Sequence, residues 1–314
     1  MSVAEKGLLH TKRGVRGVLK EMRREWTAYL FNAPGLILFA VFVVYSLSTS
    51  FFLSFHQWNI LQPDKPFVGL DNYRRVLSDS AYWDSIGRTI YFTLGSVPLT
   101  MAIGLGLALL LNTKIRGLGI FRTAYYLPVI TPIVIAAIIW KWVYNADFGL
   151  ANYYLAKFHI IDKPLLWLSD KDLAMPAVIV MNIWKGVGFN MIVYLAGLQA
   201  IPGEFYEAAE VDGAGPWQKF CRITLPLVAP TTFFLLVINT IGAMKVFPQI
   251  FVMTNGGPPG PGGATTTVVF YIYTQAFKFF NMGYASALAY VLFLLLFVVS
   301  FAQFRWYMKR VEET

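Results

Sequence analysis

The sequence is poor in charged residues: only 14% of its 314 residues are Asp, Glu, Lys or Arg, whereas soluble domains usually carry about 25%. Hydrophobic residues make up 57%. So few charges cannot cover a water-exposed surface, which excludes a soluble globular domain, a disordered chain and a coiled coil. Cys221, the single cysteine, has no internal partner, which excludes a disulfide-rich scaffold. The composition predicts an integral membrane protein.

Motifs for catalysis are also missing. No G-x-x-x-x-G-K-[ST] phosphate loop is present, so we expect this chain not to hydrolyse ATP. His10, His56 and His159 are scattered and lack the spacing of metal ligands, so we predict no metal site and no cofactor on this chain. H-E-x-x-H and G-x-S-x-G are absent too. A membrane-embedded transferase is therefore a weak alternative, and a non-catalytic subunit is expected.

Long apolar runs dominate instead. Six segments reach the roughly 20 residues that a helix needs to cross a bilayer, and none contains Asp or Glu. The expected spans are 28–55, 87–111, 123–144, 174–200, 226–252 and 285–304. A proton- or sodium-driven carrier usually needs acids at membrane depth, which disfavours that rival. The predicted fold is all-α, a polytopic membrane bundle of six transmembrane helices.

Two sequence features refine the bundle. Gly104 and Gly106 provide a small-residue face for close helix packing. Several prolines are expected to kink their spans, since each removes a backbone donor. These prolines are Pro98, Pro128, Pro132, Pro230 and Pro248.

The distribution of Lys and Arg predicts the orientation. Fifteen basic residues lie in the terminal and even-numbered connecting segments, against seven in the others. The basic-rich segments are 1–27, 112–122, 201–225 and 305–314. Because cytoplasmic loops carry the excess, both termini are expected in the cytoplasm. The net charge of +9 lies beside apolar runs, so we expect a lipid bilayer, and no nucleic acid, as its partner.

The connection 201–225 has the pattern of two short helices. Residues 204–211 are helix formers, with Phe205 on an apolar face. Gly213 suits a left-handed turn, and Pro216 suits the first turn of a second helix. Such a unit can dock in a groove of a partner protein, or it can pack against its own subunit.

The same segment carries a resemblance. Glu207-Ala208-Ala209, Gly213, Ile223 and Leu225-Pro226 are spaced as in the signature loop of ABC importer permeases. Four further stretches resemble the carbohydrate-uptake branch, which includes the larger maltose-permease subunit and the glycerol-3-phosphate permeases. These stretches are 67–73, 126–128, 182–202 and 254–258. The resemblance covers residues 28–304, between a basic segment 1–27 and a tail 305–314.

The resemblance implies a type I importer in the cell (inner) membrane. Its implied partners are a second homologous permease subunit, two ATPase subunits that bind ATP and Mg, an extracytoplasmic solute-binding protein and a sugar. In such systems the signature loop fits a cleft on the ATPase. Here the implied coupling residues are Glu204, Glu207, Ala208, Ala209, Asp212, Gly213, Ile223, Leu225 and Pro226. Homodimeric pathways exist in the wider family, although the carbohydrate branch usually pairs two different permeases.

The maltose-type resemblance also implies solute contacts on two helical faces spaced i, i+3, i+4 and i+7. They are Asn182, Lys185, Gly186 and Phe189 on the fourth span, and Asn239, Gly242, Ala243 and Val246 on the fifth. An amide beside an aromatic ring suits a sugar. Polar residues here can equally join helices. The fifth span has fewer asparagines than the maltose-type pattern, which weakens the case for a maltose-like contact set.

Three lysines near or within the bilayer leave the solute's charge open. Lys185 lies near mid-span, where it is costly unless it meets water, a partner or an anionic ligand. An acidic oligosaccharide or a sugar phosphate is therefore one hypothesis, although relatives thought to carry neutral sugars have this lysine too. Lys141 can instead snorkel to the outer surface, and the role of Lys245 is open. A permease for a non-sugar solute is the main alternative, and residues 255–263 are expected to form an external turn.

Overall fold

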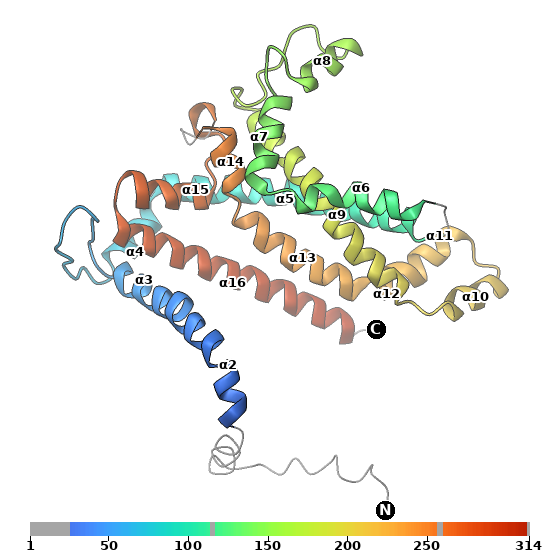
Figure 1. Ribbon diagram of the computed structural model, residues 1–314, viewed down its shortest axis with the longest axis horizontal. Coiled ribbons are helices and arrows are strands. Elements are labelled where there is room, and N and C mark those ends of the chain that lie inside the picture. The colour runs from blue at the N-terminus through green and yellow to red at the C-terminus, as the bar shows by residue number, and fades with distance from the viewer. Residues whose placement is uncertain (1–25, 114–116, 256–259, 313–314) are drawn as a thin grey trace, which may run out of the picture.

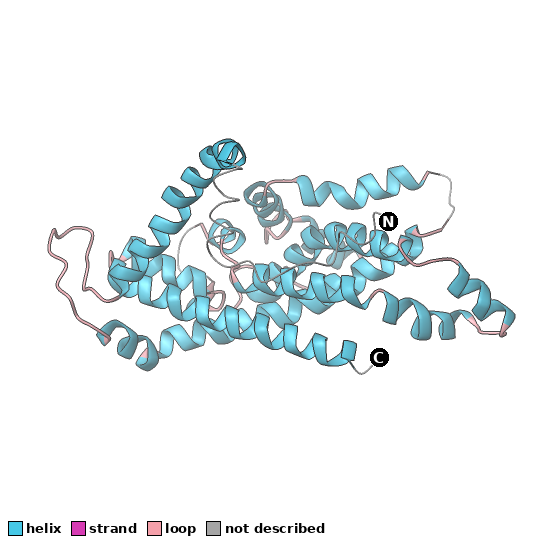
Figure 2. Ribbon diagram, turned by 90° about the horizontal axis from the view of Figure 1, so that it is seen from below, coloured by secondary structure: helices cyan, strands magenta, loops and turns pink. Residues whose placement is uncertain are grey.

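The computed structural model describes residues 26–113, 117–255 and 260–312. Within these ranges the chain is an elongated bundle of helices without strands (Figures 1 and 2). The basic segment 1–27 lies outside the described residues except for its last two, and the expected external turn at 255–263 does so at 256–259.

Four predicted spans are confirmed as long apolar helices. The first combines α2 (Trp26–Phe39), a π-helical stretch η2 (Ala40–Tyr45) and α3 (Ser46–Ser54). The other three are α5 (Ser80–Leu111), α9 (Ala174–Gln199) and α16 (Met282–Glu312). In the first span only α3 packs on the bundle, against α16, whereas α2 has no buried residue.

The third predicted span is not one helix. It consists of α6 (Leu118–Ile130) and α7 (Ile133–Val143), which meet at an angle of 98°. Thr131 and Pro132 between them have extended backbones, with ψ angles of 127° and 136°. A residue before proline is driven out of the helical region, and the proline has no N–H to continue the ladder. The span predicted over 123–144, with kinks expected at Pro128 and Pro132, is therefore broken into two helices rather than kinked within one.

The fifth predicted span is divided as well. The segment α11 (Pro216–Lys219), η3 (Phe220–Thr224) and α12 (Leu225–Leu227) meets α13 (Ala229–Met244) at 62°. Beyond α13 the chain breaks again before α14 (Pro248–Met253). Counting each bent pair as one span gives six in the described chain.

The prolines divide into two groups. Pro132 lies in a break, while Pro230 and Pro248 stand in the first turn of a new helix, where a missing donor costs little. Pro98 and Pro128 lie inside helices that continue past them. The expected disruption is thus concentrated at Pro132, Pro230 and Pro248.

The core lies where α5, α9 and α13 pack together (Figure 1). Gly104 of α5 touches α9 so closely that a Cβ would lie 2.6 Å from the Cβ of Asn190. Gly106 faces open space, so only one of the two glycines serves the predicted close packing. The buried side chains that fill this core include Phe92, Met181, Met191, Leu235 and Ile250.

Short elements cover the ends of the bundle. The connection after the first span contains α4 (Asp71–Ser78), and the connection after α7 contains α8 (Leu150–Lys157). Before α16 come η4 (Pro261–Gly263), α15 (Val268–Tyr273) and η5 (Thr274–Lys278). The remaining helix, α10 (Glu204–Val211), projects at one end of the molecule (Figure 1).

Asp79 ties four of these elements together. Its carboxylate caps α5 by accepting bonds from the backbone N–H groups of Ala81 and Tyr82, and it also accepts from the hydroxyls of Tyr271 and Tyr284. Burial alone would raise the pKa of this carboxyl, but the hydrogen bonds outweigh it and hold the pKa below its ordinary value. The network fixes α4, α15 and α16 against the start of α5.

Candidate functional site

The predicted pair of short helices in the connection 201–225 is confirmed. α10 ends at Val211, Asp212 follows, and Gly213 adopts φ +75°, the left-handed conformation that favours glycine. The N–H of Ala214 donates to the carbonyl of Ala209 at 2.8 Å, which closes the helix end. Pro216 then begins the second helix, as its fixed φ allows.

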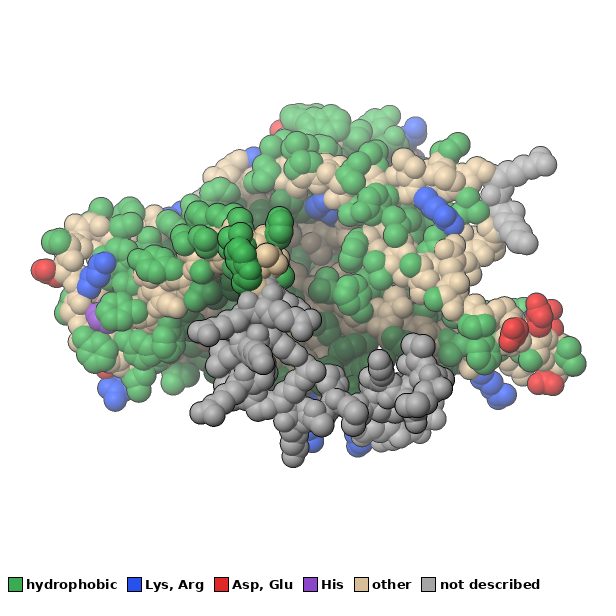
Figure 3. Space-filling model, turned by 60° about the horizontal axis from the view of Figure 1, so that its bottom comes forward, with side chains coloured by type: hydrophobic (Ala, Val, Ile, Leu, Met, Phe, Trp, Pro, Cys, Tyr) green, Lys and Arg blue, Asp and Glu red, His purple; other side chains and the backbone are tan. Residues whose placement is uncertain are grey.

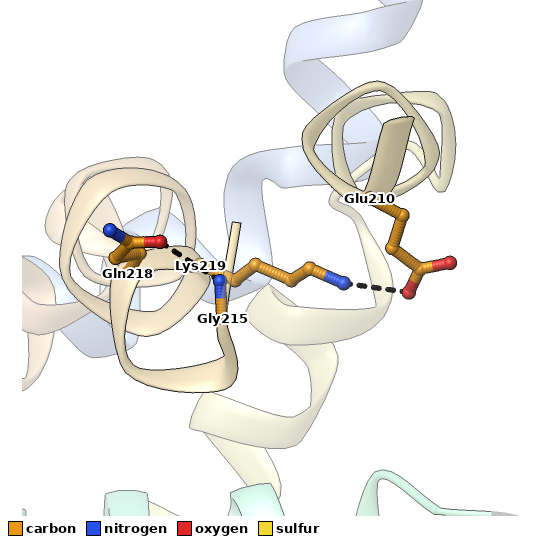
Figure 4. A network of polar contacts seen from close by, with 4 residues as sticks. All are labelled: Glu210, Gly215, Gln218 and Lys219. Atoms are coloured by element: carbon orange, nitrogen blue, oxygen red, sulfur yellow. Dashed lines mark hydrogen bonds and ion pairs between the residues drawn. The ribbon is translucent and has the colours of Figure 1, made fainter. Parts of the chain in front are cut away.

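The turn between the two helices is braced from within. Lys219 Nζ lies 2.7 Å from Glu210 Oε1, and the N–H of Gly215 donates to Gln218 Oε1 at 2.9 Å (Figure 4). The hydrogen bond and the positive charge of Lys219 lower the pKa of Glu210. The Tyr206 hydroxyl also lies 2.9 Å from Thr224 Oγ1, which ties α10 to η3. The loop is therefore a preformed unit rather than a loose connection.

The outward side of this unit has an acidic and apolar surface. α10 has no buried residue, and Glu204 and Glu207 are exposed without an ion pair in the described part of the chain. Acidic side chains gather at the end of the molecule that carries α10 (Figure 3). Val211 and Trp217 are 89% and 73% exposed. This geometry favours docking with a partner over packing within the subunit.

The other coupling residues predicted from the resemblance lie in the same unit. Ala208 and Asp212 are exposed, and Ala209 is half-buried. Ile223 is half-buried in η3, whereas Leu225 and Pro226 are exposed in α12. All nine are thus brought together between α10 and α12, and their role in coupling stays a prediction.

The residues predicted on α9 to contact the solute lie where this helix meets α5, α6 and α14. Asn182 Oδ1 accepts a hydrogen bond from Gln249 of α14 at 3.3 Å. Gly186 packs on α5, where a Cβ would lie 3.0 Å from Thr100 Cγ2. Phe189 is half-buried against the core.

The residues predicted on α13 differ in accessibility. Asn239 pairs with Asn190 of α9, with its Nδ2 2.8 Å from Asn190 Oδ1. Gly242 is exposed and faces open space. Ala243 and Val246 are only 6% and 2% exposed, within the core. Both predicted asparagines therefore join helices in this conformation, and solute contact by any of the eight residues stays a prediction.

Lys185 has an unexpected environment. Its ammonium donates to the backbone carbonyls of Pro128, Val129 and Thr131 at 3.1, 3.3 and 2.8 Å. These carbonyls lie at the break between α6 and α7. Sequence reasoning considered water, a partner or an anionic ligand for this lysine, but not the end of a broken helix. Pro132 was the sequence signal for this contact, because a proline has no N–H to donate to a carbonyl of the preceding turn.

The two other lysines lie elsewhere. Lys141, near the end of α7, donates to Asn255 Oδ1, whereas Lys245 is exposed just after α13. Lys141 borders a cavity of about 520 Å³ whose wall includes Tyr144 and Trp167. A second cavity of about 610 Å³, lined by Trp58 and Arg75 among others, opens beside α4. The three lysines therefore do not form one cationic site.

Several known proteins are similar to this chain. The permease protein of the trehalose/maltose transport system of Thermococcus litoralis is 39% identical over 276 residues, covering 87% of this chain and 90% of that protein. The permease protein of the sn-glycerol-3-phosphate transport system of Agrobacterium fabrum is 36% identical over 289 residues, covering 90% and 95%.

A solved structure is also similar to this chain over most of its length. A chain of a bacterial ABC transporter involved in the import of the acidic polysaccharide alginate superimposes with a TM-score of 0.79 at 26% identity, covering 93% of this chain and 98% of that one. Residues 96–313 match the family of binding-protein-dependent transport system inner membrane components. With the matched region covering more than half of the sequence, the chain belongs to this family.

Proposed function

We propose that this chain forms half of the translocation pathway of an ABC importer for a sugar or oligosaccharide. A second, homologous permease would form the other half, and an extracytoplasmic binding protein would deliver the solute. ATP and Mg²⁺ would bind to two ATPase subunits, and this chain would be non-catalytic. The family match and the relatives named above support this assignment.

The observation that carries the proposal is the braced helix pair between α9 and α12. Coupling to a separate ATPase requires a rigid cytoplasmic element that transmits displacement to the spans. The Lys219–Glu210 ion pair and the Tyr206–Thr224 contact supply rigidity, while Glu207 remains exposed toward a partner. Closure of the ATPases would move α10 inward and rotate α9 and α13 through their connections.

The proposed solute contacts lie along α9 and α13, where an amide and an aromatic ring can face a sugar. Asn182, Phe189 and Gly242 are accessible enough to take part without large movement. Ala243 and Val246 would become available only when helices separate during transport. The likeness to an alginate importer supports an acidic oligosaccharide as the first candidate.

The experiment is ATPase activity of the purified complex in liposomes, with its binding protein and a panel of neutral and acidic oligosaccharides. Stimulation by one sugar class supports the proposal and identifies the charge of the solute. Stimulation only by a non-sugar, such as a peptide or an amino acid, would instead identify a permease for another solute class. Uptake driven by an ion gradient without any ATPase would contradict the importer assignment.

A further inference from the structure

The break between α6 and α7 exposes carbonyls that need donors. In a helix, the carbonyl of Pro128 would accept from the N–H of residue 132, but that residue is proline. Val129 would use residue 133, which the extended backbone of Thr131 and Pro132 turns away. Unpaired backbone groups are unfavourable at membrane depth, where water cannot replace the lost donor. The 98° bend therefore requires donors from outside the helix.

The chain supplies these donors from the side chain of Lys185. The carbonyl of Leu127, one residue earlier, also accepts a hydrogen bond from the Thr131 hydroxyl at 3.0 Å. Lys185 donates to the next carbonyls, those of Pro128 and Val129, and to that of Thr131 beyond the helix end. An ammonium has three N–H groups, and all three have an acceptor here.

The backbone of α9 is fitted to the same place. Gly188, three residues after Lys185 and on the same helical face, lies against α6. A Cβ at Gly188 would be 2.1 Å from the carbonyl oxygen of Tyr125. Only glycine allows this approach, which brings the Lys185 ammonium within reach of the end of α6.

We propose that Lys185 is a positioning residue that holds the break between α6 and α7 open against α9, and that it is not the receptor of an anionic group on the solute. Two groups that are each costly in a bilayer, an ammonium and unpaired carbonyls, satisfy one another. The charge preference of the transporter must then come from other residues. Only the uptake part of the test below rests on the proposed function.

The direct test measures the geometry of the break. In the assembled complex with Cys221→Ser, spin labels at Ile120→Cys in α6 and Ile138→Cys in α7 report the distance between the two helices. Both positions are exposed in the structure. Lys185→Met keeps an unbranched side chain of nearly the same length but removes all donors, and we expect it to broaden the distance distribution. Lys245→Met, which removes a lysine outside the break, is the matched control and should leave the distribution unchanged.

The second readout is uptake by the same complex in liposomes. For Lys185→Met we expect the maximal rate to fall about tenfold, for acidic and neutral sugars alike. A fall of this size corresponds to the loss of roughly one strong polar contact. The KM values should stay within about twofold of the wild type, because no solute contact is lost. An unchanged distance distribution overturns the proposal, and so does a rise of KM confined to acidic sugars.

Lys185→Gln covers the case in which the methionine variant fails to assemble. Its amide keeps donors without charge, so a positioning role predicts an intermediate distance distribution and an unchanged preference between acidic and neutral sugars. A receptor role predicts loss of the preference for acidic sugars, which would overturn the proposal. If the wild type transports no sugar, the proposed function fails, whereas the spin-label result still decides the role of Lys185.

Discussion

At the scale of single residues, the acids of α10 are not equivalent. Glu210 already has a partner in Lys219 of its own loop, whereas Glu207 is exposed and unpaired among the described residues. A carboxylate with an internal partner stabilises the loop, and one without a partner is available for another protein. The resemblance to a signature loop implies docking through Glu207, which is exposed, as Glu204 and Asp212 are, and this role stays a prediction.

We therefore expect Glu207→Ala to reduce sugar-stimulated ATPase activity at least tenfold, since a charged contact at a docked interface contributes on that scale. The measurement is ATPase activity of the reconstituted complex, with the amount of permease checked by blotting. Glu210→Gln is the matched control and should retain most activity, because its amide oxygen can still accept the hydrogen bond from Lys219 and so keeps the loop braced. Equal activity of wild type and Glu207→Ala would contradict docking through this residue.

The pairing of Asn190 with Asn239 makes a different prediction. Asn239→Leu leaves Oδ1 of the fully buried Asn190 without the donor from Asn239, which should destabilise the protein by about 1 kcal/mol. The measurement is the thermal midpoint of the purified complex in detergent, without solute. The double variant Asn190→Leu/Asn239→Leu should lose less stability than the sum of the losses of the two single variants. Strict additivity would show that the amides do not hold α9 and α13 together.

At the scale of elements, the glycines of α5 offer a matched pair. Gly104→Ala would place a Cβ 2.6 Å from Asn190, so α5 and α9 would have to separate, at a cost of about 1–3 kcal/mol. Gly106→Ala meets nothing within 4 Å and should be neutral or slightly stabilising. Thermal unfolding of both variants checks this difference. Similar melting temperatures would mean that the helix contact adjusts without strain.

The helices and their membrane character were predictable because apolar runs of sufficient length have few other uses. The paired helices of the connection 201–225 were predictable as well, since Gly213 and Pro216 have strong local preferences. Pro132 predicts a kink in its span, whereas the structure has a complete break at Thr131 and Pro132. A single proline leaves both a kink and a break open, and the outcome depends on whether a distant side chain can donate to the freed carbonyls.

Lys185 is that side chain, and it lies more than fifty residues away in the sequence. Spacing along one helix identifies which residues share a face, but not which helix that face meets. The same limit applies to Asn182 and Asn239, whose partners Gln249 and Asn190 come from other helices. Tertiary contacts, rather than local pattern, decided how these polar side chains are used.

At the scale of the whole molecule, α9 connects two segments that must face opposite sides of the membrane. The helix has 26 residues, so it is about 39 Å long at 1.5 Å per residue, enough to cross the bilayer once. The connection before it contains α8, and the connection after it contains α10. The excess of basic residues predicts that α10 lies in the cytoplasm and α8 outside.

Single cysteines in a Cys221→Ser background test this orientation. In intact cells stripped of any outer membrane, a membrane-impermeant thiol reagent should label Asp147→Cys, which lies just before α8, and should leave Glu204→Cys unlabelled. Inside-out vesicles should reverse the result. Both native side chains are exposed in the structure, so a difference in labelling reports the side of the membrane rather than burial. Labelling of Glu204→Cys in the intact cells would invert the topology, and α10 could then not meet a cytoplasmic ATPase.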